Sequence, residues 1–473
     1  MQYGFLIDHT RCIGCHACTV ACKSENSVPV GNFRTWVKYV EKGTFPTLRR
    51  HFAVLRCNHC THAPCVTICP VNALEKREDG IVDIDKDACI GCRACMQACP
   101  YDAIALNDDT GSVEKCHYCA HRKEVGLQPA CVVVCPEQAI VHGDLHDPTS
   151  KIARMVKDNE TLVRRPEQRT GPNVHYLGVE ALAIEPGLPV RPSTYLWSDR
   201  PPHKPEAWPA ELATAPDTRV VLDVGHRVEW GWPVAAYLVT KGIAAGVAML
   251  APFLPVTPNW LPEAIALFFT AATTALLVED LARPMKFLTL LTRPNTKSWL
   301  VRGAWILIAF SVTLPLTFLV PQLRWVNALL GLGVAGYTAF LFAQCEGRDL
   351  WQSKLLLPHL LAGAIGAGAA VLAPFSGPAA IEIMRPAMLV FGVISLWEWK
   401  GPHATSNARQ AAAFLGTLRV GRFSPLLLGL VYAVVIPVLF GSWLGPSLPV
   451  FVLLGIALYE WAYVRAAQLP PLS

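Results

Sequence analysis

The sequence predicts two folded parts: an α+β domain of small metal-binding modules, followed by an all-α bundle of eight membrane-spanning helices. The chain has 473 residues and 17 cysteines, and 16 of these cysteines lie before residue 136. A proline-rich segment covers residues 185–216, and almost unbroken apolar stretches fill residues 232–466. We therefore expect a cysteine-rich domain over residues 1–150, a proline-rich linker or strap over 151–230, and a membrane domain over 231–473.

The cysteines of the first part form four quartets, each with short and repeated gaps. The quartets are Cys12, Cys15, Cys18 and Cys22; Cys57, Cys60, Cys65 and Cys69; Cys89, Cys92, Cys95 and Cys99; and Cys116, Cys119, Cys131 and Cys135. Two-residue gaps let one tight loop present three thiolates to a cubane, while a fourth cysteine before proline ligates the other cluster of a pair. Zinc also binds thiolates, but zinc sites use two pairs separated by a longer loop. The spacing thus predicts four [4Fe-4S] clusters in ferredoxin-like modules, each a short strand and helix around a cluster pair.

Other functions of the first part fit the composition less well. A disulfide framework suits short secreted chains, whereas this long chain opens MQYGFLIDHTRC, without a basic segment followed by an apolar one. The net charge is +5, but no basic stripe with interleaved aromatic residues indicates nucleic acid as a partner. No GxGxxG fingerprint indicates a nicotinamide or flavin site.

Residues 1–150 resemble the four-cluster iron–sulfur subunit of the DMSO reductase and polysulfide reductase family. The resemblance implies that the first quartet pairs with the fourth and the second with the third. The implied ligand sets are Cys12, Cys15, Cys18 and Cys135; Cys116, Cys119, Cys131 and Cys22; Cys57, Cys60, Cys65 and Cys99; and Cys89, Cys92, Cys95 and Cys69. It also implies a separate molybdenum or tungsten bis-pterin subunit that performs the substrate chemistry.

Eight apolar stretches follow the proline-rich segment. They cover residues 232–254, 261–282, 299–320, 325–345, 355–375, 383–398, 424–444 and 448–466. Most are close to the ~20 residues that span a ~30 Å hydrocarbon core. Buried helices of a soluble protein are the alternative, but eight successive stretches with few charges and many glycines favour a membrane bundle.

The membrane half resembles the quinone-reactive membrane subunit of polysulfide reductase and its relatives. The resemblance rests on WGWPVAAYLVTKGIAAG at 230–246 and LLVEDLARPMKFLTLLTRPN at 276–295. It implies that the chain relays electrons between its catalytic partner and ubiquinone or menaquinone, with no substrate-binding catalytic residue of its own. Sulfur-oxyanion oxidoreductases, such as sulfite dehydrogenase or polysulfide and thiosulfate reductases, are the expected class of complex.

Five ionisable or phenolic side chains form the predicted quinone site. They are Tyr237, Lys241, Glu279, Asp280 and His359, which lie in the half of the bilayer where the first helix begins. Charges inside a bilayer are costly and tend to mark function, and quinone reduction needs proton donors near its carbonyl groups. The alternative is structural, with Lys241 paired to a carboxylate and His359 capping a backbone group.

The distribution of basic residues predicts the orientation of the membrane domain. On the side of the cysteine-rich domain the loops and tail carry Arg283, Lys286, Arg293, Lys297, Arg348, Lys354, Lys400, Arg409, Arg419, Arg422 and Arg465; the other side carries Arg324 and Arg385. Basic loops stay cytoplasmic, so we expect a multi-pass protein of the inner membrane with its clusters facing the cytoplasm. The alternative is that these loops dock an acidic iron–sulfur surface.

Two other functions make different demands on the membrane half. A haem-bearing anchor would need paired axial histidines, and within the predicted spans the sequence offers His359, so we expect no haem. A redox-driven ion-translocating protein with a ferredoxin input domain would need polar residues across the whole bilayer, and these are expected in one half.

Overall fold

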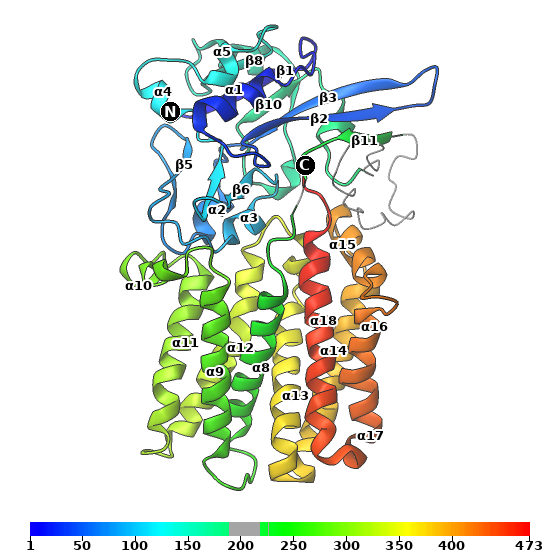
Figure 1. The fold of residues 1–473 in the computed structure, drawn as a ribbon. Helices are drawn as coiled ribbons and strands as arrows, with labels where there is room; N and C mark the ends of the chain where they lie inside the picture. The colour runs from blue at the N-terminus through cyan, green and yellow to red at the C-terminus, as the bar shows by residue number, and fades with distance from the viewer. Residues whose placement is uncertain (189–217, 226) are drawn as a thin grey trace. The chain divides into compact units, whose positions relative to one another are not determined.

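The computed structural model describes residues 1–188, 218–225 and 227–473, which form two compact units (Figure 1). The first unit contains Met1–Arg227 and Pro471–Ser473, and the second contains Val228–Pro470. Most of the proline-rich segment lies outside the described residues.

The first unit is organised around a mixed four-stranded sheet with the strand order β8-β1-β10-β9. These strands are β1 (Tyr3–Asp8), β8 (Ile140–Asp144), β9 (Thr161–Leu162) and β10 (Val174–Leu177). Strand β1 has the sequence YGFLID, and its Phe5, Leu6 and Ile7 are fully buried. It pairs antiparallel with β8 and parallel with β10.

Strand β10 pairs with β1 although it lies within the predicted linker at 151–230. Helix α6 (Lys151–Asp158) also belongs to this unit, because Ile152 packs in one cluster with Leu6 and Val141. The part of the predicted linker before the proline-rich segment is therefore folded onto the cysteine-rich domain. Proline density in the sequence says nothing about the strand and helix ahead of the segment.

The remaining elements of the first unit are short. The strands are β2 (Thr35–Lys42), β3 (Arg49–Arg56), β4 (Leu74–Lys76), β5 (Val82–Ile84), β6 (Ile104–Asn107), β7 (Ser112–Lys115) and β11 (Thr218–Leu222). The helices are α1 (Ala17–Asn26), α2 (Pro64–Ile68), α3 (Ala94–Ala98), α4 (Ala120–Glu124), α5 (Ala130–Val133) and α7 (Ala181–Ile184), with a 3₁₀ turn at Pro166–Gln168. Strands β11, β2 and β3 form a second sheet, and β4-β5 and β6-β7 are hairpins.

The second unit is a helical bundle (Figure 1). Many of its large apolar side chains are exposed. Its helices are α8 (Trp232–Leu250), α9 (Leu261–Glu279), α10 (Thr289–Thr292), α11 (Trp299–Leu316), α12 (Leu323–Ala343), α13 (Leu356–Ser376), α14 (Pro378–Lys400), α15 (Ser406–Thr417), α16 (Pro425–Leu430), α17 (Ile436–Leu444) and α18 (Leu448–Gln468). A π-helical turn at Val431–Val435 joins α16 to α17, and short 3₁₀ turns lie at Pro284–Lys286, Asp349–Gln352 and Gly445–Ser447.

Seven segments of the described chain are long and apolar enough to cross a membrane, and the last of them contains 44 residues, Pro425–Gln468. This segment makes two passes, because α16 packs against α18, which a straight helix could not allow. The reversal occurs at Gly445, whose φ of 51° is a left-handed conformation that glycine adopts readily. The described bundle therefore contains the eight passes that the sequence predicts.

Helices α8 and α13 form the centre of the bundle. Of their most apolar windows, 67% and 72% of residues are buried, against 28% for α9 and α11. Helix α8 packs against α9, α12, α13 and α18, and α13 also packs against α14. Polar side chains on α8 and α13 are consequently enclosed by protein, where they can form specific contacts.

Candidate functional site

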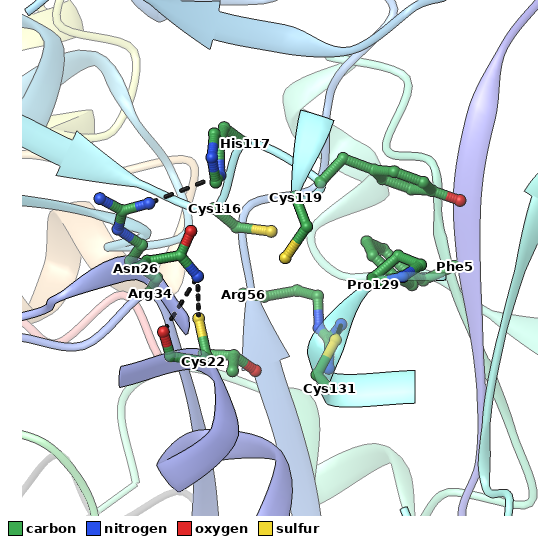
Figure 2. Close-up of a pocket in the computed structure, with 12 residues that line it drawn as sticks. Phe5, Cys22, Asn26, Arg34, Arg56, Cys116, His117, Cys119, Pro129 and Cys131 are labelled. Atoms are coloured by element: carbon green, nitrogen blue, oxygen red, sulfur yellow. Dashed lines mark hydrogen bonds between the residues drawn. The ribbon is translucent and has the colours of Figure 1, made fainter. Parts of the chain in front are cut away.

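The cysteines of the four quartets surround four separate cavities in the first unit. Cavity 1 is lined by Cys12, Cys15, Cys18 and Cys135; cavity 2 by Cys22, Cys116, Cys119 and Cys131; cavity 3 by Cys57, Cys60, Cys65 and Cys99; and cavity 4 by Cys69, Cys89, Cys92 and Cys95. Each cavity takes three cysteines from one quartet and one from another, in the grouping that the family resemblance implies. Figure 2 shows the cysteines of cavity 2.

Short helices explain why the third and fourth cysteines of each quartet face different cavities. The third cysteine of each quartet lies in a short helix, and the fourth follows four residues later, about 6 Å further along the helix axis at 1.5 Å per residue. In α1, for example, Cys18 lines cavity 1 whereas Cys22 lines cavity 2. The loops before α1 and α3 each contain a left-handed glycine, Gly14 and Gly91, which bend the backbone around the cavity.

The four cavities form a linear series. Cys18 of cavity 1 lies within electrostatic reach of Cys131 of cavity 2. Cys116 of cavity 2 lies within reach of Cys57 of cavity 3, and Cys65 of cavity 3 lies within reach of Cys95 of cavity 4. All cysteines of the two middle cavities are buried, whereas Cys15 of cavity 1 is exposed and Cys92 of cavity 4 is partly exposed. The two ends of the series are therefore its accessible points.

Burial makes the thiols of these cavities reluctant to lose their protons unless a cation is bound nearby. Burial raises the pKa of Cys18 to about 11 and the pKa values of Cys22 and Cys60 to about 12. Iron would supply the positive charge that converts such thiols to thiolates. Each cavity is lined by four cysteines, a donor set that suits a [4Fe-4S] cluster.

Backbone N–H groups after the fourth cysteines add to this fit. Burial raises the pKa of Cys69, and hydrogen bonds from the backbone of Leu74, Val71 and Ala73 partly offset that rise. In the fourth quartet the backbone N–H of Ala139 donates to the Cys135 Sγ at 3.3 Å. The turns that follow Cys-Pro thus direct donors at sulfur, which stabilises a thiolate that binds iron.

Lys241 is buried in the second unit, and the groups in direct contact with its ammonium are neutral. Its Nζ donates to the Thr338 Oγ1 and lies 3.4 Å from the Ala335 carbonyl oxygen, both on α12. The ammonium is 4.7 Å from the ring centroid of Tyr337 and 5.9 Å from that of Tyr237. In the described part of the sequence no carboxylate forms an ion pair with it. Lys241 is therefore a buried cation held by hydroxyl, carbonyl and aromatic groups.

Tyr237 lies beside Lys241 and within electrostatic reach of Asp280, whereas Glu279 is not buried with them. Tyr237 is buried one turn before Lys241 on α8, and Asp280 ends α9 within electrostatic reach of the Tyr237 hydroxyl. Glu279 is exposed. Of the five residues predicted for the quinone site, the structure brings Lys241 and Tyr237 together and places Asp280 near Tyr237.

His359 lies between two carboxylates that the sequence analysis did not select. Its Nδ1 is 3.2 Å from the Glu398 Oε2, and its Nε2 is 3.3 Å from the Glu460 Oε1. The Tyr459 hydroxyl donates to the same Glu398 oxygen at 2.7 Å. Glu460 also lies within electrostatic reach of Lys241, so the two polar groups are neighbours.

A search for every charge inside the apolar stretches would have found Glu398 and Glu460. Glu398 closes the sixth predicted stretch in the sequence WEWK, and Glu460 lies in YEW of the last. Both are nearly fully buried, at 2% and 4% exposure. Their pairing with His359 could not be read from the sequence, because it depends on how α13, α14 and α18 pack.

Comparison with known proteins identifies both halves of the chain. Residues 48–145 match the family model of the 4Fe-4S dicluster domain, and residues 221–325 match that of the polysulphide reductase NrfD. A subunit of the tetrathionate reductase of Salmonella typhimurium is 44% identical over 202 residues, which are 42% of this chain and 80% of that protein. A component of the polysulfide reductase of Wolinella succinogenes is 40% identical over 173 residues, which are 36% of this chain and 90% of that protein.

A third relative, the thiosulfate reductase electron transfer subunit PhsB of Salmonella typhi, is 45% identical over 173 residues, covering 36% of this chain and 88% of that protein. The fold and the cysteine-lined cavities define an iron–sulfur electron-transfer protein that is continuous with a multi-pass membrane domain. The protein belongs to the family of iron–sulfur subunits of the polysulfide, thiosulfate and tetrathionate reductases, fused here to an NrfD-type membrane domain. The predicted fold class is confirmed.

Proposed function

We propose that this protein is the electron-transfer and membrane subunit of a quinone-linked oxidoreductase. Electrons pass through four [4Fe-4S] clusters between a molybdenum or tungsten bis-pterin catalytic subunit and membrane quinone. The observation that carries this proposal is the linear series of four cysteine-lined cavities with accessible cysteines at its two ends. A series of redox centres with buried middle members suits conduction through a protein and gives no place for a substrate.

Each cavity holds one cluster through its own four cysteines in this proposal. Cavities 1 to 4 use the ligand sets given above, so that all sixteen quartet cysteines are ligands. A bound [4Fe-4S] cluster supplies one-electron transfer. The protein supplies the thiolates, the N–H groups that face sulfur and the exclusion of water.

The catalytic partner is a separate protein in this proposal, since the family consists of subunits of reductases. The relatives are named as components of tetrathionate, polysulfide and thiosulfate reductases. We therefore assign the substrate of the complex to the sulfur oxyanions and polysulfides. The exposed Cys15 makes cavity 1 an accessible end for electron exchange.

The quinone, ubiquinone or menaquinone, binds near Lys241, Tyr237 and Asp280 in this proposal. The support is that a buried ammonium, with no ion-paired carboxylate among the described residues, lies beside a phenol and near a carboxylate. Such groups can donate protons to quinone carbonyls. His359 and Glu460, which form the neighbouring group of polar side chains, would supply protons to Lys241. Glu279, exposed at the end of α9, would bring protons to Asp280.

The clusters face the cytoplasm in this proposal, and the bundle lies in the inner membrane. The excess of basic residues in the loops on the side where α8 begins supports this orientation. Protease protection in inside-out vesicles tests it. Cleavage of the cysteine-rich unit is expected from the outside of such vesicles, and protection of that unit would reverse the orientation.

Purification of the complex tests the proposed function directly. The protein should co-purify with a molybdopterin-containing subunit, and reduced quinone or the substrate of the partner should reduce or oxidise the clusters. Isolation of a stable complex without any pterin cofactor would contradict the proposal.

A second function is redox-driven ion translocation. It is favoured by a set of polar side chains at the end of the bundle opposite to the Lys241 region. A small pocket is lined there by Glu263, Arg324 and Asn327. Glu263 is buried and pairs with the Arg324 Nε at 2.5 Å. Polar residues therefore lie near both ends of the bundle, whereas the sequence analysis expected them in one half of the bilayer. Between these ends, Thr270 and Thr273 are buried on α9.

Reconstituted vesicles distinguish the two functions. An electron-transfer subunit without translocation should show no more proton movement than quinone chemistry at the membrane requires. A translocating protein should move additional protons, and Glu263→Gln should abolish that excess while quinone turnover continues.

A further inference from the structure

Arg56 places a buried positive charge in cavity 2. It is the last residue of β3, where it pairs with Thr35 of β2, and its side chain is fully buried. Figure 2 shows its guanidinium among the cysteines of this cavity. The Nη1 donates to the Cys131 Sγ at 3.3 Å, and the guanidinium carbon lies 4.5 Å from the ring centroid of Phe5.

Two donors of Arg56 have no acceptor among the described residues. These are the Nε and the Nη2, both buried. No carboxylate in the described part of the sequence forms an ion pair with this guanidinium. Buried polar groups without a partner are costly, so an acceptor inside the cavity would stabilise the arrangement. The sulfides and thiolates of a cluster are such acceptors.

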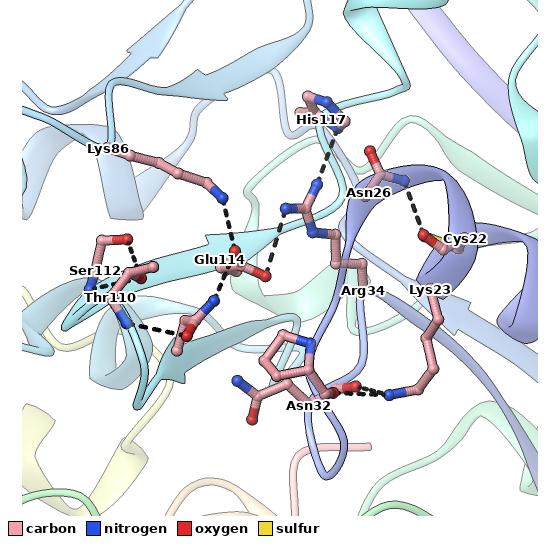
Figure 3. Close-up of polar contacts among 12 residues, drawn as sticks. Cys22, Lys23, Asn26, Asn32, Arg34, Lys86, Thr110, Ser112, Glu114 and His117 are labelled. Carbon is pink, nitrogen blue, oxygen red and sulfur yellow. Dashed lines mark hydrogen bonds and ion pairs between the residues drawn. The ribbon is translucent and has the colours of Figure 1, made fainter.

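Arg34 provides a direct contrast within the same cavity. Its Nη2 is 3.4 Å from the Glu114 Oε2, and its Nη1 is 3.4 Å from the His117 Nδ1. Glu114 is shared with Lys86, whose Nζ lies 2.7 Å away, as Figure 3 shows. The charge of Arg34 is therefore offset by a carboxylate, whereas that of Arg56 faces the cysteines: Cys131, Cys116 and Cys18 lie within its electrostatic reach.

Lys115 provides a second contrast, next to cavity 3. It is buried and lies within electrostatic reach of Cys65. Its ammonium is satisfied by the backbone carbonyls of Val82 and Cys116. Lys115 therefore has its donors directed at the backbone, whereas the guanidinium of Arg56 has donors left for a cluster.

We propose that Arg56 raises the reduction potential of the cluster in cavity 2 above the value that its four cysteines alone would give. This inference rests on the proposed assignment of one [4Fe-4S] cluster to each cavity. Reduction adds one electron to the cluster, breaks no bond and leaves the proton on Arg56. A fixed cation in a low-dielectric interior stabilises the more negative, reduced cluster, and N–H donors to sulfur act in the same direction. Cavity 2 then becomes a favoured resting place for an electron inside the series.

Potentiometric titration of the clusters, followed by electron paramagnetic resonance, tests the inference in the purified complex. In Arg56→Gln one of the midpoint potentials should fall, and at the wild-type midpoint the ratio of reduced to oxidised cluster should fall at least tenfold, a shift of about 59 mV for one electron. Arg56→Lys keeps the charge but loses the planar fork, so it should give a smaller fall. Arg34→Gln is the matched control and should shift the potential less than Arg56→Gln.

The cluster that shifts should be the one whose spectrum changes in Cys119→Ser, because Cys119 lines cavity 2. Full iron content with unchanged potentials in Arg56→Gln would overturn the inference and leave the proposed function intact. If the glutamine variant does not assemble, the neutral variant Arg56→Met takes its place, and unchanged potentials there overturn the inference. An equal fall in Arg34→Gln would also overturn it. A wild-type protein that contains no iron–sulfur cluster after purification would instead contradict the proposed function.

Discussion

At the scale of one residue, Lys241 shows how burial changes the reactivity of a side chain. A buried ammonium costs free energy unless it is well solvated by protein groups, and its neighbours here are a hydroxyl, a carbonyl and aromatic rings. Such a group transfers a proton or binds a carbonyl oxygen more readily than an exposed lysine does. The side chain is therefore suited to act on a quinone that approaches α8.

Replacing Lys241 should separate quinone chemistry from the rest of the electron path. In Lys241→Ala and in Asp280→Asn, quinone-linked turnover of the complex should fall by roughly a hundredfold or more, the usual contribution of a general acid. Reduction of an artificial dye by the catalytic partner should survive. Lys400→Ala is the matched control, because Lys400 is exposed at the end of α14. Quinone turnover that persists in both variants would place the quinone elsewhere.

His359 should stabilise the bundle through the two carboxylates that it separates. His359→Ala leaves Glu398 and Glu460 buried without their shared partner, and loss of one member of a buried ion pair costs about 3–5 kcal/mol. Thermal unfolding in detergent should show the loss. Glu398→Gln added to His359→Ala should recover part of it, since one buried charge is then removed. Equal stability of the wild type and His359→Ala would contradict this account.

Single residues differ in how far the sequence reveals them. The cysteine quartets were recognisable because their spacing matches the geometry of a [4Fe-4S] cluster. Lys241 was recognisable because a lysine in an apolar stretch is rare. The partners of His359 were not recognisable, because Glu398 and Glu460 approach it from helices far apart in the sequence. Arg56 was hidden for the same reason, since it lies on a strand beside the second quartet but reaches into cavity 2.

Among the elements, the crossing of α8 and α13 depends on two glycines. A Cβ atom on Gly246 would lie 1.8 Å from the Ala364 carbonyl oxygen, and one on Gly368 would lie 2.2 Å from the Gly246 carbonyl carbon. The two backbones are therefore in direct contact, as in other membrane helices that pack through small residues. This close contact makes α8 and α13 the rigid centre to which Lys241 and His359 are attached.

An alanine at Gly246 should force α8 and α13 apart. Overpacking of this kind costs about 1–3 kcal/mol, and the variant should lose thermal stability in detergent and some quinone turnover. Gly242→Ala is the control on the same helix, because its Cβ would lie 3.8 Å from the nearest atom, the Ala364 Cα. That variant should keep or raise stability, since alanine favours helix over glycine. Equal loss in both variants would contradict the close-contact account.

The helical passes were predictable from apolar length, but smaller elements were not. The structure places α12 at Leu323–Ala343, close to the predicted 325–345, because hydrophobic runs set the ends of membrane helices. Helix α15 (Ser406–Thr417) was not predicted, since its polar composition lies outside any apolar stretch. Strand β10 was missed because four residues, VHYL, give no clear periodicity until they pair with β1.

For the whole molecule, the two units are stabilised by different interactions. The bundle satisfies its backbone hydrogen bonds within helices and buries small residues between them. The first unit has short elements and two small hairpins, and its quartets surround cavities rather than packed side chains. Its thiols are held at raised pKa by burial, so a bound cluster must contribute to the stability of this unit.

Iron should therefore be both the redox centre and the structural core of the first unit. The purified protein should contain about sixteen iron atoms, four for each [4Fe-4S] cluster.

Cys92→Ala should lose the cluster of cavity 4 and destabilise the hairpin β4-β5, whose Leu74 and Ile84 line that cavity. Cys345→Ala is the control, because this buried cysteine lies outside the quartets and contacts the Leu341 carbonyl oxygen at 3.5 Å. It should keep all the iron. Iron near four atoms per molecule, or stoichiometric zinc, would contradict the four-cluster assignment. Chelation of the iron should melt the first unit while the helical content of the bundle stays, because only the first unit depends on cluster binding to fold.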